Sequence, residues 1–258
     1  MRGINIANED HVIGLFADDI IIYLQNPDST LPKLMVTLDE YGQKSGYKLN
    51  IVKTQILSFN YTPSKDIRRK YKVKWEATSI KYLGVLISQK LDNIYEINSK
   101  IINNKIQEDI KKWSTLGLDF SSRIEALKIN LLPRLLYLFL SLPVRIPDSQ
   151  FLMWDKQLSR FIWVGARPRV RFKTLQIDKE HGGLAVANLK EYYYAAQMRY
   201  FVYWCSPEYQ ARWKHIELNL VDSPPQTRLG GKQHTNHKGE NLILENAFKN
   251  WYELKSIN

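Results

Sequence analysis

The sequence predicts an α+β protein, with hairpin strands and one helix in the N-terminal third and mainly helices in the remainder. Two apolar runs, "VIGLFA" and "IIIYL", are rich in β-branched residues and too short for helices. Beyond residue 92, apolar residues recur at three- and four-residue intervals instead. The chain has 258 residues, of which 44% are hydrophobic and 12% aromatic, so it can bury a sizeable core and is expected to fold.

The two apolar runs flank adjacent carboxylates, Asp18 and Asp19, and a two-residue Asp–Asp connection predicts a tight β-hairpin. Aspartate is an ordinary turn residue, because its short side chain tolerates unusual backbone angles. Two carboxylates at a rigid tip are also hard oxygen ligands for Mg²⁺. One such pair cannot hold both ions of a two-metal site. Asp10 is too close in sequence to be an independent third ligand and is expected in a loop.

Three further elements follow in the N-terminal third. Pro32 near the start and Gly46 at the end predict a helix over residues 33–45. An extended piece, "YKLNIVKTQILSF", then carries Lys53, and a basic segment, "SKDIRRKYKVKW", follows it. The phrase "IKYLGVLIS", residues 80–88, predicts a strand–glycine–strand turn.

The remainder predicts four helices. The first spans residues 92–114, and a capping box at Ser122–Glu125 opens the second. Pro133 should kink or interrupt the second helix before it continues over residues 134–141. The other two are expected over residues 148–163 and 189–204, and we interpret their apolar stripes as core packing.

Four cations alternate with other residues in "ARPRVRFKTL": Arg167, Arg169, Arg171 and Lys173. On a strand, this spacing puts all four on one face. They can line the phosphates of a nucleic acid, or they can form a solvated surface, and spacing alone leaves both interpretations open.

The tail after Ser206 predicts a linker, with a short final helix in "NLILENAFKNWYELK". His234 and His237 are three residues apart, but no neighbouring ligand completes a metal set, so we reject a metal site there.

Charge and cysteine content bound the partners. With 37 Lys and Arg against 26 Asp and Glu, the chain carries a net charge of +11 and favours a polyanionic partner. A single cysteine, Cys205, excludes an internal disulfide and suggests a reducing compartment. The first residues lack a signal peptide, and the most apolar window is about half a membrane span. We therefore expect an intracellular protein of the cytoplasm or nucleus without a membrane partner; the sequence assigns no oligomeric state.

The motifs "FADD", "SGYKLNIVKT" and "IKYLGVLI", with a helix between the first two, resemble in order and spacing the last three palm motifs of a reverse transcriptase. Their detailed sequence resembles the reverse transcriptases of LINE-type, non-LTR retrotransposons. Downstream, "RIEALKINLLPRLLYLFLSLPV", "LSRFIW" and "GGLAVANLKEYYYAAQMRY" resemble the thumb and post-thumb region of that family. The resemblance covers roughly residues 1–204. It implies a truncated palm over residues 1–90, made of an antiparallel hairpin plus a helix. A helical thumb over 91–145, a helical post-thumb region over 146–205 and the tail over 206–258 would follow.

The resemblance also implies an RNA-directed DNA polymerase acting on an RNA template and a DNA primer. Asp18 and Asp19 would be the catalytic aspartates and ligands of Mg²⁺, with Asp18 the stronger candidate. Lys53 would help to protonate the departing pyrophosphate, or it is a solvated lysine. Tyr82, Leu83 and Gly84 would form the primer grip, or only a well-packed strand turn. Arg167, Arg169, Arg171 and Lys173 would contact the RNA–DNA hybrid.

The resemblance further implies that the fingers and the strand with the first catalytic aspartate lie outside this sequence. We therefore expect the chain to be catalytically incomplete, to hold Mg²⁺ weakly or not at all, and to be an internal slice of a retroelement. Two other functions stay open. One is a non-catalytic module that binds RNA or an RNA–DNA hybrid through the thumb; the other is a helical interaction protein without a nucleic-acid role.

Overall fold

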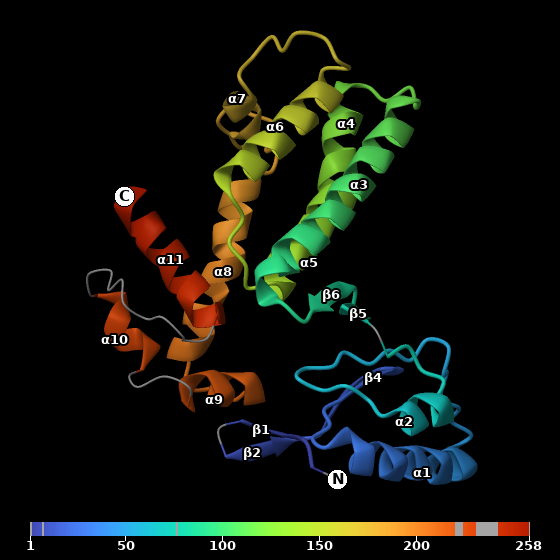
Figure 1. Cartoon of the computed structure of the whole chain (residues 1–258). Coiled ribbons are helices and arrows are strands. Elements are labelled where there is room, and N and C mark those ends of the chain that lie inside the picture. The colour runs from blue at the N-terminus through green and yellow to red at the C-terminus, as the bar shows by residue number, and fades with distance from the viewer. Residues whose placement is uncertain (1, 7, 76, 220–223, 231–241, 258) are drawn as a thin grey trace. The chain divides into compact units, whose positions relative to one another are not determined.

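The computed structural model describes residues 2–6, 8–75, 77–219, 224–230 and 242–257. The chain divides into two compact units, residues 1–94 and 95–258 (Figure 1). The first unit holds all the described strands, and the second is helical. The α+β class predicted from the sequence is confirmed at this level.

The strands of the first unit form three separate two-stranded antiparallel sheets. Their bounds are β1 Ile4–Ile6 with β2 Glu9–His11, β3 Ile13–Phe16 with β4 Asp19–Ile22, and β5 Ser79–Tyr82 with β6 Val85–Ser88. The hairpins predicted around the Asp pair and over residues 80–88 are confirmed. The loop predicted at Asp10 is wrong, because Asp10 pairs with Asn5 in the β1–β2 hairpin and accepts a 3.0 Å hydrogen bond from its side chain.

Two helices cover the first unit's core: α1 Pro27–Ser45 and α2 Lys65–Lys70. The predicted end of α1 at Gly46 is confirmed, and Gly46 has φ 75°. Its start lies six residues before the predicted one, because Pro27 presets the backbone of the first turn. Pro32 therefore lies inside the helix.

The first unit's core joins these helices to the hairpin strand β4. Leu31 and Leu34 of α1 are buried with Ile67 and Tyr71 of the α2 region. Partly buried apolar side chains pack against them, among them Ile22 and Leu24 at the end of β4. The strand that begins at Asp19 is thus fixed at its far end. The extended piece predicted after α1 is only partly extended, since it contains a turn at residues 51–53 and a single bridge from Gln55 to Lys74.

The helices after residue 90 include those that the sequence predicts, together with the short α7 Phe172–Gln176, α9 Arg212–Asn219 and α10 Pro225–Leu229, which it does not predict. The others are η1 Leu91–Asn93, α3 Ile94–Ser114, α4 Phe120–Ala126, the π-helical η2 Leu127–Leu131, α5 Leu132–Ser141, α6 Asp148–Ile162, α8 Leu189–Cys205 and α11 Leu242–Ile257. The helices predicted over residues 92–114, 148–163 and 189–204 are confirmed within two residues at each end. In the part that the structure describes, none of these helices combines the length and the apolar character that crossing a membrane requires.

The second predicted helix differs at its start. The capping box at Ser122–Glu125 is wrong, because Asp119 caps α4 and accepts a 2.6 Å hydrogen bond from the Ser122 backbone N–H. A carboxylate three residues earlier satisfies the same amide and begins the helix sooner. The predicted interruption is confirmed, since η2 separates α4 from α5 and Pro133 lies in the first turn of α5.

The second unit has two aromatic clusters. Phe139, Trp154 and Tyr193 of α5, α6 and α8 lie together, and the Tyr193 hydroxyl donates a 2.9 Å hydrogen bond to the Val144 carbonyl. The other cluster joins Phe201 and Trp204 of α8 to buried residues of α11.

The predicted final helix is confirmed as α11, and the segment after Ser206 is not only a linker. Trp213 and Leu218 of α9 pack against the α8–α11 cluster, so α9 and α11 both complete the core that α8 begins. The expected linker over residues 231–241 lies outside the described residues.

Glu217 of α9 is a buried carboxyl within this second cluster. It is 4% exposed and accepts a 2.7 Å hydrogen bond from Nε1 of Trp204. Burial is the main cause that raises the pKa of Glu217 to about 7, although the bond from Trp204 lowers it. The folded state therefore holds the Glu217 proton more tightly than the unfolded state.

We predict that Glu217 makes the free energy of unfolding fall as pH rises. The contribution of the raised pKa to stability is fully present below the ordinary pKa of 4.5, where the carboxyl is protonated in both states. This contribution is lost as pH rises through the folded pKa of about 7. Glu217→Gln keeps an acceptor for Trp204 without the charge. Urea denaturation across this range should find the variant more stable than the parent above the folded pKa, by up to about 3 kcal/mol. A difference between the two that does not change with pH would contradict this account.

Gly183 follows α7 and lies against backbone. A Cβ at this position would be 1.9 Å from the Ile177 carbonyl oxygen, which accepts the Ala185 backbone N–H at 2.8 Å. A side chain there requires the backbone to shift.

We therefore expect Gly183→Ala to lower the free energy of unfolding by about 2 kcal/mol or more, because a packed backbone carbonyl cannot move aside. Gly117→Ala is the matched control, since no atom lies within 4 Å of its added Cβ. Thermal denaturation of both variants measures the difference, and equal melting temperatures would show that the carbonyl yields.

Candidate nucleic-acid and metal site

The Asp pair lies at a two-residue hairpin turn, shifted by one position from the prediction. Phe16 pairs with Asp19, so Ala17 and Asp18 form the turn and Asp19 begins β4. The predicted Asp–Asp connection is therefore wrong. A turn of this length between twisted strands requires a positive φ, and Ala17 supplies it with φ 51°. The turn sets Asp18 at the tip and Asp19 directly beside it.

Both carboxylates are available to a ligand. Asp18 and Asp19 are exposed, and within the described residues neither side chain has a hydrogen-bond or ion-pair partner. Adjacent free carboxylate oxygens suit Mg²⁺, which is commonly held by one or two carboxylates plus water and phosphate oxygens. The described residues contain no group of three or more His, Cys, Asp or Glu that could hold a metal ion. The turn can thus supply two carboxylates to a metal site.

The strand β3 beside this turn presents apolar side chains to solvent. Ile13 is 52% exposed, Leu15 68% and Phe16 60%. Three large apolar side chains within four residues are unusual on a free surface. The carboxylates therefore stand beside an uncovered apolar strand.

Lys53 lies in a turn in the first unit. Its backbone N–H donates 3.1 Å hydrogen bonds to both the carbonyl and the side-chain oxygen of Asn50. Such an Asn-led turn fixes the backbone locally. The Lys53 side chain is exposed.

The predicted grip residues form the β5–β6 turn. Leu83 and Gly84 both have positive φ, 45° and 82°, as a type I′ turn requires. Tyr82 is paired with Val85 at the end of the strands. Burial raises the pKa of Tyr23 and the Tyr82 phenol adds to the effect, so Tyr82 lies in the neighbourhood of the chain that follows β4.

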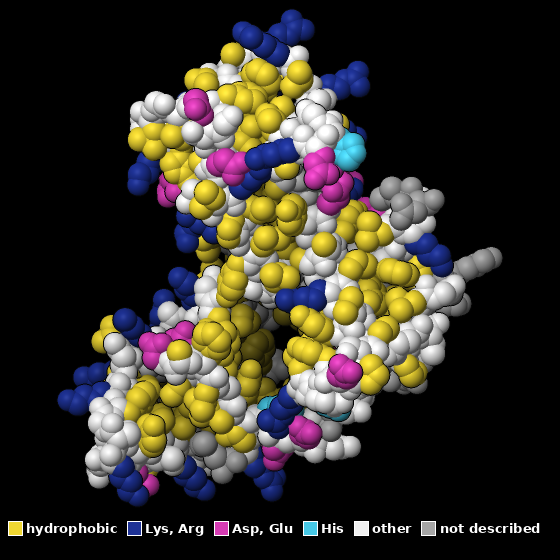
Figure 2. Space-filling model, turned by 180° about the vertical axis from the view of Figure 1, so that it is seen from behind, with side chains coloured by type: hydrophobic (Ala, Val, Ile, Leu, Met, Phe, Trp, Pro, Cys, Tyr) yellow, Lys and Arg dark blue, Asp and Glu magenta, His cyan; other side chains and the backbone are white. Residues whose placement is uncertain are grey.

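The four cations after α6 do not lie on a strand, the one condition under which their spacing would place them on a common face. Residues 166–171 form bends and loop, and Lys173 lies in α7. Pro168 lacks an amide donor, and no other strand of the second unit is described with which this segment could pair. Arg167, Arg169, Arg171 and Lys173 are all exposed, but they do not share a strand face. Lys and Arg side chains project from the end of the second unit where the α6–α7 connection lies (Figures 1 and 2).

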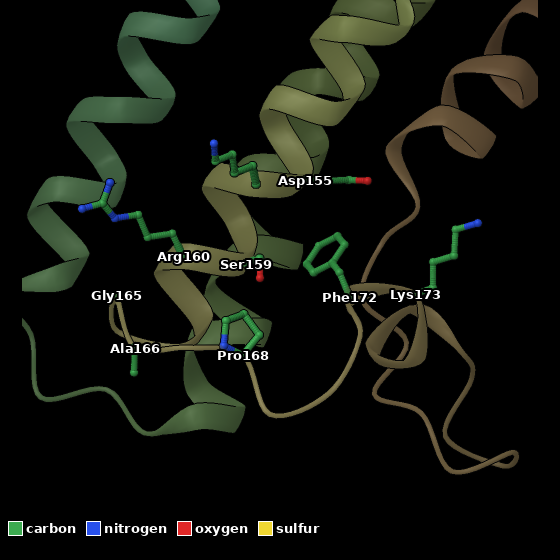
Figure 3. Close-up of a pocket in the computed structure, with 9 residues that line it drawn as sticks. Asp155, Ser159, Arg160, Gly165, Ala166, Pro168, Phe172 and Lys173 are labelled. Carbon is green, nitrogen blue, oxygen red and sulfur yellow. The ribbon is translucent and has the colours of Figure 1, made fainter.

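A second group of cations was missed by the sequence reasoning. Lys156 and Arg160 of α6 line a pocket together with Phe172 and Lys173 (Figure 3). Lys156 and Arg160 are one helical turn apart, so they lie on the same face of α6. This i, i+4 spacing is the signal in the sequence that could have predicted a cationic face beside the apolar stripe of the helix. The rejected pair His234 and His237 lies outside the described residues.

The segment that contains the Asp pair is also the segment that matches a known protein family. Residues 2–87 match the family model described as reverse transcriptase (RNA-dependent DNA polymerase). The match ends within β6 and falls inside the first compact unit, so it includes the Asp18–Asp19 turn, Lys53 and the β5–β6 turn. The first unit of this chain is therefore similar to a reverse transcriptase domain.

Proposed function

We propose that the first unit is a palm segment of an RNA-directed DNA polymerase of the non-LTR retrotransposon type. The observation that carries the proposal is the pair of free carboxylates at the Ala17–Asp18 turn, inside a segment that matches reverse transcriptases. The non-LTR type is supported by the detailed sequence of the motifs and by the downstream segments that resemble a thumb. Asp18 and Asp19 are the carboxylates that hold catalytic magnesium.

Magnesium, when bound, would activate the primer 3′-hydroxyl and stabilise the leaving pyrophosphate. The chain's own residues have positioning roles around it. In this proposal Lys53, which is exposed on its Asn50-led turn, donates a proton to the departing pyrophosphate. The Tyr82–Gly84 turn supports the primer end through a rigid pair of positive-φ residues.

Two carboxylates do not complete a two-metal site. Within the described residues, no further carboxylate or histidine joins Asp18 and Asp19 in a metal-holding group. We therefore propose that these 258 residues alone bind magnesium weakly and do not extend a primer. A polypeptide supplying another aspartate strand would restore the chemistry.

A second candidate is a non-catalytic module for RNA or RNA–DNA hybrids. The net charge of +11 and the exposed cations of the α6–α7 connection favour it. Under this function the carboxylates at the hairpin tip play no part.

The two candidates differ in what a transplant of the matched segment does. Residues 2–87 replace the corresponding segment of an active non-LTR reverse transcriptase, and primer extension on an RNA template is measured with Mg²⁺. We expect the chimera to extend the primer, and Asp18→Ala to reduce its rate by about 100-fold or more, since loss of even an outer metal contact costs about 10–100-fold. The unmodified 258-residue chain, assayed alongside, should not extend.

Asp10→Ala in the same chimera is the matched control. Asp10 is also an exposed carboxylate on a hairpin of this unit, but it is bonded to Asn5. We expect this variant to keep the activity. Equal activity of the Asp18→Ala chimera and its parent would remove the metal role, and the binding module would then be the better account.

A further inference from the structure

The second unit contains a pocket of about 460 Å³ between α6, the α6–α7 connection and α7 (Figure 3). Its size is in the range of small-molecule and cofactor sites. The residues that line it are Asp155, Lys156, Ser159, Arg160, Gly165, Ala166, Pro168, Phe172 and Lys173.

The pocket exists because the chain reverses sharply after α6. The Gly165 backbone N–H donates a 2.9 Å hydrogen bond to the Arg160 carbonyl, and both Val164 and Gly165 have positive φ, as at a Schellman helix end. The returning chain is fixed at α7 by buried Leu175, whose carbonyl accepts the Val186 backbone N–H at 2.9 Å. The two walls are thus held by separate backbone contacts.

Three cations surround the pocket without neutralising partners. Lys156 and Arg160 come from α6 and Lys173 from α7, and none of them forms an ion pair or a side-chain hydrogen bond within the described residues. Asp155 is the one acid of the lining; burial raises the pKa of its carboxyl, and it forms no ion pair within the described residues. Residues 155–173 hold six Lys and Arg against this single acid.

An aromatic side chain lies between the cations. The half-buried Phe172 ring points toward α6, and Pro168 and Ala166 belong to the same loop wall (Figure 3). Arg160 extends from α6 on one side of this ring and Lys173 from α7 on the other, and the charged ends of both side chains point away from the ring. An aromatic face flanked by cations is the arrangement on which an unpaired base stacks while its neighbouring phosphates are held.

We propose that this pocket binds one nucleotide of a single-stranded nucleic acid. The base stacks on Phe172, the phosphate on one side lies against Lys156 and Arg160, and the phosphate on the other side lies against Lys173. Arg167, Arg169 and Arg171 continue the cationic track along the exposed connection. The choice of nucleic acid rests on the proposed function, but the pocket belongs to the second unit and involves neither Asp18 nor Asp19.

The test is fluorescence anisotropy of the full chain with a short labelled single-stranded RNA across a salt series. The double variant Lys156→Glu/Arg160→Glu should weaken binding about tenfold or more and reduce the slope of log K against log salt by about 0.7, because one phosphate contact is lost. Phe172→Leu keeps an apolar side chain without an aromatic face. It should weaken binding about fivefold or more with the slope unchanged.

The matched control is Lys100→Glu/Lys105→Glu, which changes the charge equally on exposed positions of α3 outside the pocket. We expect this control to bind nearly as the parent does, and a matched RNA duplex to bind more weakly than the single strand because its bases are not free to stack. Circular dichroism confirms that each variant is folded.

Equal losses in the α3 control, no effect of Phe172→Leu, or equal binding of the duplex would overturn the proposal. Phosphatidylserine vesicles provide a further arm, because Val164 and Val170 beside the pocket are exposed. Vesicle binding that depends on Lys156 and Arg160, without RNA binding, would assign the cations to a membrane surface. The chimera that tests the polymerase proposal takes residues 2–87 of this chain and none of the pocket residues, so failure of the polymerase proposal and failure of this one are separable.

Discussion

The register of the β3–β4 hairpin is the constraint on which the candidate metal site depends. Ile22 and Leu24 are two residues apart on one face of the chain, and both pack against the α1–α2 core. Asp19 is an odd number of residues before them, so it starts the strand on the opposite face. A slip of one residue would turn Ile22 and Leu24 away from the core, so the packing of the far end fixes the carboxylates at the tip.

The same hairpin carries two costs. Ala17 occupies a left-handed conformation that glycine adopts more easily, and such strain costs about 1–3 kcal/mol. Ile13, Leu15 and Phe16 remain largely in water. A two-stranded sheet is only marginally stable by itself, so the order of the tip derives from the helical core behind it. Both costs fit a turn whose position matters more than its stability.

Periodicity and glycines made much of the fold predictable. The helix ending at Gly46, the Leu83–Gly84 turn and the long helices from α3 to α8 follow from signals within each segment. The start of α1 and the cap of α4 were predicted too late, because each segment offers two local start signals. Pro27 begins α1 before Pro32, and Asp119 caps α4 before Ser122. The alternation after Arg167 would place the cations on one face only in a strand. The sequence could not decide whether a strand forms, because a strand also needs a partner and alternation does not reveal one.

The candidate sites differ in the same way. The Asp pair was predictable because both residues and their turn lie within one short stretch, and only its register was wrong by one position. The pocket was not predictable, because Arg160 and Phe172 line the same pocket only after the chain reverses at Val164 and Gly165. No periodic pattern in the sequence links cations in a helix to an aromatic residue twelve positions later.

The most direct test of the account is a titration of the isotopically labelled chain with Mn²⁺, followed by NMR. A paramagnetic ion broadens the signals of nearby amides even when it binds weakly. The account predicts that the amide signals of Ala17, Asp18, Asp19 and Ile20 broaden first, that excess Mg²⁺ restores them, and that Asp18→Asn/Asp19→Asn prevents the effect. Signals at this turn that stay sharp while those of other acidic surfaces broaden would contradict the claim that the Asp pair is a metal site.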